Sequence, residues 1–141
     1  FVQQENQSHG SAVIAISARD VPPVMKGNTY HHNWFGAISV NPGKVTLENE
    51  TFYDNAAAIR VQGEAELSLI NCILGKDRKG RERPNVDADI SVLKGSKTRI
   101  TLRDCVFASP TTVSGLKEAP GTSVRSENHN RVKGQNKTWK P

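Results

Sequence analysis

The sequence contains few of the residues and patterns on which several protein classes depend. Its 141 residues include two cysteines and four histidines, and no Cys-x-x-Cys or mixed Cys/His spacing of the zinc-binding kind occurs. No apolar run approaches the roughly 20 residues of a transmembrane helix, and no charged-then-apolar leader is visible. The sequence therefore predicts no structural metal, no cofactor and no membrane span. A secreted or cell-surface location is favoured.

Helical periodicity is also lacking. Apolar residues recur at every second position rather than at every third or fourth, which indicates β-strands. Three stretches share one pattern, and a looser copy precedes them: residues 44–52 (KVTLENETF), 66–74 (ELSLINCIL), 99–107 (RITLRDCVF) and 22–30 (PPVMKGNTY). The first two copies are 22 residues apart and the next follows after 33, one period plus an insertion between Leu74 and Ile90. A fixed period of this size indicates a solenoid.

A second strand precedes each copy, at Ile14, Ile38, Ile59 and Ile90. The fold class predicted from the repeat is all-β, with three short strands in each of four to five turns, the fifth near residues 122–124. The motifs Asn-Glu-Thr-Phe, Asn-Cys-Ile-Leu and Asp-Cys-Val-Phe that end the copies resemble those of right-handed parallel β-helices, the pectate-lyase-like superfamily. The resemblance covers residues 12–108 and implies a right-handed coil. It does not imply one activity, because that superfamily includes lyases, hydrolases, epimerases, esterases, adhesins and non-catalytic modules.

Stacking of equivalent residues at about 4.8 Å would place like residues in columns. The predicted inward columns are Met25/Leu47/Leu69/Leu102, Ile16/Val40/Val61/Val92 and Tyr30/Phe52/Leu74/Phe107. Asn and Asp tolerate a left-handed backbone, and Gly adopts it freely. The expected bend columns are Gly27/Asn49/Asn71/Asp104, Asn33/Asn55/Asp77 and Gly43/Gly63/Gly95.

Outside the repeats the composition becomes polar. We interpret residues 1–11 as an N-terminal cap or lead-in, 12–108 as the β-helix, and 109–141 as a loop-rich C-terminal cap or linker. The chain begins at Phe1 without an initiator Met, and a rod this short predicts a fragment or one module of a larger protein. Its end turns would then meet neighbouring domains or other copies.

Cys72 and Cys105 occupy equivalent positions one turn apart. In-register parallel side chains point the same way, which gives poor disulfide torsions. Two small half-buried thiols are therefore favoured over a disulfide, and metal binding by this pair alone is disfavoured.

The resemblance implies that ligands lie along the outward face of the strands that follow the third bend, here Ala15/Ser39/Arg60/Ser91. The insertion beside that bend carries five cations: Lys76, Arg78, Lys79, Arg81 and Arg83. With a net charge of +5, a basic loop beside Arg60 predicts an anionic partner such as a uronate polysaccharide, a sulfated glycan or nucleic acid. A solvated hairpin without a ligand is the alternative.

His31 and Trp34 complete the candidate binding residues. Adjacent side chains in a bend are expected to point apart, so His31 and His32 should not chelate one ion easily, and one of these rings is expected to pack on Trp34. Trp34 and Phe35 can stack on a sugar or cover the core, and the core position is favoured.

These sequence features lead to two alternative hypotheses about function. The first is a non-catalytic module that presents a binding or spacer surface. The alternative is a fragment of a polysaccharide-acting enzyme: a uronate lyase using Arg60 with His31 or His32, or a glycoside hydrolase using Asp54 and Asp77 as its carboxylate pair. The motif set of polygalacturonase-like enzymes is absent, and we assign no catalytic residue.

Overall fold

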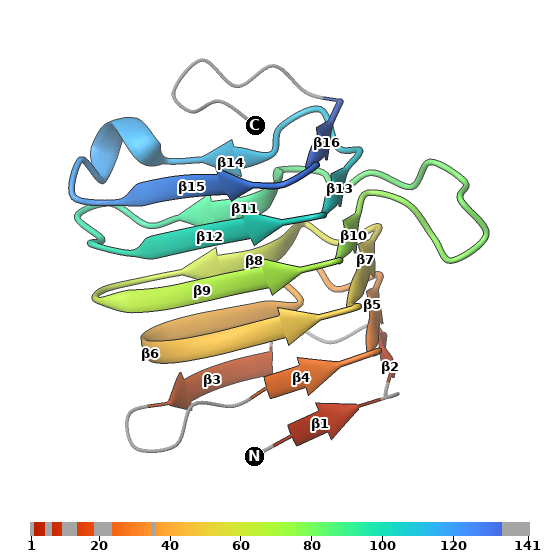
Figure 1. The fold of residues 1–141 in the computed structure, drawn as a ribbon, viewed down its shortest axis with the longest axis horizontal. Coiled ribbons are helices and arrows are strands. Elements are labelled where there is room, and N and C mark those ends of the chain that lie inside the picture. The colour runs from red at the N-terminus through yellow and green to blue at the C-terminus, as the bar shows by residue number, and fades with distance from the viewer. Residues whose placement is uncertain (1, 5–6, 10–13, 19–23, 35, 134–141) are drawn as a thin grey trace.

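The chain winds into a parallel β-solenoid of about five turns (Figure 1). The computed structural model describes residues 2–4, 7–9, 14–18, 24–34 and 36–133. Every strand-to-strand pairing in these residues is parallel. The predicted all-β solenoid with three strands per turn is therefore confirmed.

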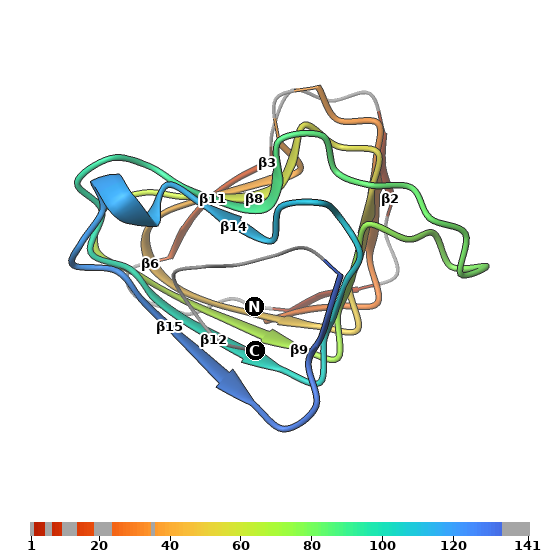
Figure 2. The same ribbon diagram turned by 90° about the horizontal axis from the view of Figure 1, so that it is seen from above.

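Each turn contributes one strand to each of three faces, which give the coil its roughly triangular outline in Figure 2. The first face contains β3 (Ile14–Ala18), the start of β6 (Ile38–Glu48), β8 (Ala57–Val61), β11 (Ala88–Val92) and β14 (Val113–Ser114). The second contains β1 (Val2–Gln4), β4 (Val24–Lys26), the end of β6, β9 (Ala65–Ile70), β12 (Arg99–Arg103) and β15 (Ser123–Glu127). The third contains β2 (Gln7–His9), β5 (Thr29–His31), β7 (Thr51–Tyr53), β10 (Ile73–Leu74), β13 (Val106–Phe107) and β16 (Arg131–Val132).

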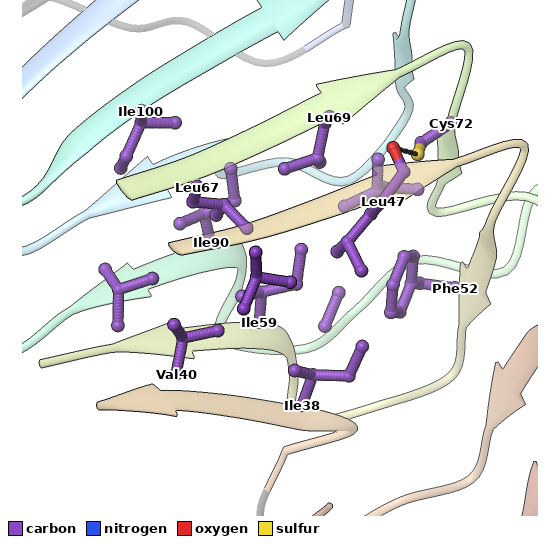
Figure 3. Close-up of a cluster of buried hydrophobic side chains, with 14 of the residues drawn as sticks. Ile38, Val40, Leu47, Phe52, Ile59, Leu67, Leu69, Cys72, Ile90 and Ile100 are labelled. Atoms are coloured by element: carbon purple, nitrogen blue, oxygen red, sulfur yellow. Dashed lines mark hydrogen bonds between the residues drawn. The ribbon is translucent and has the colours of Figure 1, made fainter. Parts of the chain in front are cut away.

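The strand register is the one that the repeat predicted. Leu47 pairs with Met25 and with Leu69, and Leu69 pairs with Leu102. The aromatic column on the third face and the Val column on the first face are likewise in register. The described side chains of these columns are at most 4% exposed. Figure 3 shows members of all three columns, Val40, Leu47, Phe52 and Leu69, in the interior of the coil. Alternation within each strand therefore separates the core from the surface.

The bend between the second and third faces uses left-handed residues, as expected. Asn49, Asn71 and Asp104 have φ of 54°, 53° and 53°, and Asn71 Nδ2 donates to Asn49 Oδ1 at 2.5 Å. Asn128 extends this column with φ 59° and donates to Asp104 Oδ2 at 3.3 Å. The repeat pattern did not include Asn128, because the apolar alternation that marks the earlier copies weakens around it.

The second polar column differs from the prediction at one position. Asn33 Nδ2 donates to Asn55 Oδ1 at 2.8 Å, and Asn55 Nδ2 donates to Asn85 Oδ1 at 3.1 Å. Asn85, not Asp77, is thus the third member. The assignment of Asp77 was wrong because the insertion displaces the register: Asp77 lies inside the loop that precedes the bend, and the chain returns to the column eight residues later.

A buried polar column lies just after the left-handed bend. Its inward members include Glu50, Cys72 and Cys105, each 0% exposed. Glu50 Oε1 accepts from Asn28 N at 2.9 Å and from Asn28 Nδ2 at 3.0 Å. Both cysteines are free thiols, as favoured, but they are fully buried rather than half-buried. Burial raises the pKa of Cys72, so its thiol stays protonated at neutral pH.

The coil continues on both sides of residues 12–108. β1 and β2 pair in register with β4 and β5, while β14, β15 and β16 pair with the strands of the preceding turn.

Phe35 and residues 134–141 lie outside the described residues. A 3-10 turn, η1 (Leu116–Glu118), is the only helical element of the described residues. None of their helices has the length and apolarity needed to cross a membrane.

Candidate anion-binding site

The insertion forms a short hairpin, residues 75–83, that leaves the coil after β10. It is the green loop protruding from the coil in Figures 1 and 2. Lys76 and Glu82 form an antiparallel bridge. At the tip, Asp77 Oδ1 accepts from Lys79 N at 2.9 Å and Arg81 N at 3.0 Å, and Asp77 Oδ2 faces Arg81 Nε at 2.7 Å. The Asp77 carboxylate therefore organises the tip from within.

Three charged side chains, Arg78, Arg83 and Lys133, are among the groups that attach the hairpin to the coil. Arg78 Nη2 donates to the Gly27 carbonyl at 2.7 Å, and Arg83 forms an ion pair with Asp54. Lys133 Nζ approaches Glu82 Oε2 at 2.8 Å. Gly27 belongs to an early turn and Lys133 to the last described one. The hairpin thus projects from the third face, and its side-chain contacts reach both an early turn and the last described turn of the coil.

A pocket of about 500 Å³ lies between the hairpin and the last strands of the third face. Its floor is formed by Ile73 and Val106, which are in-register neighbours on β10 and β13. The earlier turns carry Thr29 and Thr51 at the same outward position. The remaining lining residues are Lys76, Asp77, Arg78, Gly80, Glu82, Phe107, Ala108, Arg131, Val132 and Lys133.

The rim of this pocket is predominantly basic, with four cations and two carboxylates. Desolvation opposes ionisation of Asp77, but the N–H donors and charge of Arg81 outweigh it and lower the Asp77 pKa. The hydrogen bond and charge of Lys133, with a smaller contribution from the charge of Lys76, lower the pKa of Glu82. Both carboxylates are thus ionised and already matched by cations. Among the described side chains, no carboxylate forms an ion pair with Lys76, Arg78 or Arg131.

A second polar cluster lies on the third face where the hairpin returns to the coil. His31 stacks on Tyr53 with ring centroids 5.0 Å apart, and the Arg83 guanidinium lies 5.8 Å from the centre of the Tyr53 ring. His32 Nε2 is 3.3 Å from Asp54 Oδ2. The two histidines also meet, with their Nδ1 atoms 2.7 Å apart. The expectation that these adjacent side chains point apart was wrong, because His32 adopts a left-handed backbone with φ 56°.

The structure places the predicted site residues in separate groups. Arg60 projects from the first face, where it lies 3.5 Å from Asp87 Oδ2 and donates to Ser91 Oγ at 3.4 Å. The five insertion cations lie on the hairpin beside the third face. Lys79 and Arg81 are exposed, whereas Arg83 is turned toward Tyr53 and Asp54. Arg60 thus contacts Asp87 and Ser91, whereas Arg78 contacts Gly27 and Arg83 contacts Asp54 and Tyr53.

Trp34 is 77% exposed. The preference for a core position of this residue was therefore wrong. The expectation that a histidine packs on Trp34 was also wrong, because His31 stacks on Tyr53 instead. The side chain follows the third bend, where the backbone turns toward the next face and leaves this position outside the coil.

Sequence reasoning missed two parts of the pocket. Arg131 lies on β16 and Lys133 directly follows it, in a stretch interpreted as a loop-rich cap. The apolar floor carried a signal, because Ile73 and Val106 replace Thr at an outward position of the repeat. An apolar residue at an outward position indicates either contact with another segment or a binding surface.

Comparisons of the chain with protein-family models, with curated proteins and with solved structures gave no significant match.

Proposed function

We propose that this chain is a non-catalytic β-solenoid module that binds an acidic glycan at the pocket between the hairpin and the third face. The observation that carries the proposal is the combination of an apolar floor, Ile73 and Val106, with a rim on which Lys76 and Arg131 have no ion-pair partner among the described residues. A sugar ring offers an apolar face to such a floor, and its carboxylate or sulfate offers charge to the rim. Binding of this kind is within the range of functions that the pectate-lyase-like resemblance implies.

Two further observations support the non-catalytic part of the proposal. A hydrolase of the expected type needs a carboxylate pair, but Asp54 is neutralised by Arg83 and Asp77 by Arg81. A lyase would need Arg60 to meet a substrate carboxylate. Its guanidinium instead faces Asp87 and Ser91.

The test compares two double variants of the full chain that remove the same charge. Lys76→Ser/Arg131→Ser alters the pocket rim and leaves the three hairpin anchors intact. Lys44→Ser/Arg99→Ser is the control, because both cations lie on the second face and pair with Glu66. Binding is measured by titration calorimetry with polygalacturonate and with heparin, at two salt concentrations, and dextran serves as the neutral polymer.

We expect the wild-type chain to bind at least one of the two polyanions, more weakly at the higher salt concentration, and not to bind dextran. The pocket variant should bind at least tenfold more weakly, and the control variant within twofold of wild type. Equal losses of affinity in both variants would show that the polyanion binds by non-specific charge attraction and would contradict the proposed site. An unchanged affinity in the pocket variant would refute the proposal.

A further inference from the structure

The meeting of His31 and His32 follows from a left-handed bend at the end of β5. His32 has φ 56°, and Asp54, its equivalent in the next turn, has φ 54°. A left-handed residue rotates its side chain relative to its predecessor, so the two imidazoles come together. Their ring planes are 81° apart, and the Nδ1 atoms are separated by 2.7 Å.

In the structure this separation is that of a hydrogen bond between the two rings, and it also brings two nitrogen atoms close enough to bind one metal ion. Nitrogen ligands bind late divalent metals at about 2.0–2.1 Å. Two such bonds to atoms 2.7 Å apart enclose an angle of about 80° at the metal, from triangle geometry with those bond lengths. This is near the right angle of tetragonal or octahedral coordination and far from the tetrahedral angle. Cu²⁺ and Ni²⁺ prefer the former, whereas Zn²⁺ in protein sites is usually tetrahedral.

The surroundings orient both rings. His32 Nε2 lies 3.3 Å from Asp54 Oδ2, and a carboxylate on the distal nitrogen is the usual support of a metal-binding histidine. The negative charge of this carboxylate favours the tautomer of neutral His32 that carries its proton on Nε2, and this tautomer leaves Nδ1 as the ligand atom. His31 is held by its stacking on Tyr53, at 8° between the ring planes.

Charge and access are compatible with a bound cation. Arg83 Nη2 lies 3.5 Å from His32 Nε2, so its charge repels a metal ion bound to His32. The Asp54 carboxylate, which pairs with Arg83, offsets this repulsion. The His32 side chain is 44% exposed, so the remaining coordination positions can be filled by water. When a metal binds, neutral His31 moves its proton from Nδ1 to Nε2, and no net proton is released.

From these contacts we propose that His31 and His32 bind one late divalent transition-metal ion, Cu²⁺ or Ni²⁺, through their Nδ1 atoms, with Asp54 positioning His32. This site is separate from the anion-binding pocket, so either proposal can fail without the other.

The experiment uses the full chain without a histidine tag and adds Cu²⁺, Ni²⁺ or Zn²⁺ alone at pH 7.4. Calorimetry gives stoichiometry and affinity, and electron paramagnetic resonance of the Cu²⁺ form counts coordinating nitrogens. His31→Phe keeps a ring to stack on Tyr53, and His32→Asn keeps a residue that tolerates the left-handed backbone. His129→Gln is the control, because His129 is an exposed histidine elsewhere on the chain.

We expect one equivalent of Cu²⁺ with two coordinating nitrogens, and Ni²⁺ binding tighter than Zn²⁺. Affinity should fall at least tenfold in His31→Phe and in His32→Asn, and roughly tenfold or more in Asp54→Asn. The His129→Gln variant should bind as wild type does. Wild-type affinity in either of the first two variants would overturn the proposal, as would Zn²⁺ binding tighter than Ni²⁺ or the absence of a two-nitrogen signal.

Discussion

Lys133 Nζ lies 2.8 Å from Glu82 Oε2, although 51 residues separate them in the chain. This ion pair joins the residue after β16, the last described strand of the third face, to the hairpin, and it crosses the basic rim of the pocket. Glu82 thereby neutralises Lys133, one of the cations that an anionic ligand would contact.

Replacing Glu82 should therefore strengthen anion binding. In Glu82→Gln, Lys133 loses its internal partner, and polyanion affinity should rise about two- to fivefold, because an exposed pair of this kind is worth at most about 1 kcal/mol. Calorimetry with heparin or polygalacturonate at constant salt checks this. Glu118→Gln changes net charge equally at an exposed residue of η1 and should have a smaller effect. A weaker affinity in Glu82→Gln would contradict the assigned role of Lys133.

The asparagine ladder predicts different costs for two substitutions at one position. Asn71 has φ 53° and donates to Asn49. Asn71→Ala loses the hydrogen bond and places a Cβ in the left-handed region, so we expect a loss of about 1–2 kcal/mol in the free energy of unfolding. Asn71→Gly loses only the hydrogen bond and some unfolded-state entropy, and it should cost less. Urea denaturation of both variants tests this order, and a more stable Ala variant would be inconsistent with the ladder.

Asp89 should make stability depend on pH. This carboxyl accepts from Ser109 Oγ at 2.5 Å and from Asn85 Nδ2 at 2.9 Å, but its Oδ2 atom is buried without a hydrogen-bond partner. Burial raises its pKa from 3.8 to about 7. Because the folded pKa is raised, the folded state favours the protonated form. The resulting stability is complete below about pH 4 and is lost as the pH rises through 7.

The Asp89→Asn variant should remove this dependence. Between pH 4 and pH 8 the wild type should lose up to roughly 4 kcal/mol more stability than the variant, as an upper limit from the size of the pKa shift. Denaturation curves at several pH values provide the measurement. Asp87→Asn, which changes an exposed carboxylate two residues away, is the matched control and should keep the wild-type slope. Parallel pH profiles for wild type and Asp89→Asn would show that Asp89 does not titrate in this range.

Glu50 should contribute to stability through its buried hydrogen bonds. Glu50→Ala leaves two donors of Asn28, N and Nδ2, without their acceptor, and an unpaired buried donor costs about 1–3 kcal/mol. Glu50→Gln keeps an acceptor oxygen and nearly the same volume, so it should be the milder change. Chemical denaturation distinguishes the two. If both variants lost equal stability, the Asn28 contacts would not account for the role of Glu50.

The sequence was sufficient for the coil because its information is local and repeated. Leu47, Leu69 and Leu102 each follow the same alternation and the same Asn or Asp bend, so one assignment fixed the register of all three turns. The prediction of the third residue in the Asn33/Asn55 column was wrong for a related reason. An insertion breaks the period, and within it neither spacing nor composition shows which residue returns to the bend.

The binding surfaces required more than repetition. Cations of the hairpin were visible in the sequence, but their separation from Arg60, and their proximity to Arg131 and Lys133, depend on the direction in which the loop folds. The convergence of His31 and His32 depends on one left-handed φ that a histidine adopts only in context.

By itself, then, the sequence determined the all-β coil, its three-strand turns and the columns of its interior, because stacked strands repeat the same short-range hydrogen bonding and alternation in every turn. Only the tertiary structure decided where the hairpin lies, which cations face the pocket and how the two histidines meet. The position of the hairpin depends on single contacts between residues 51 positions apart. The meeting of the histidines depends on one left-handed φ at His32, and the repeat pattern encodes neither feature.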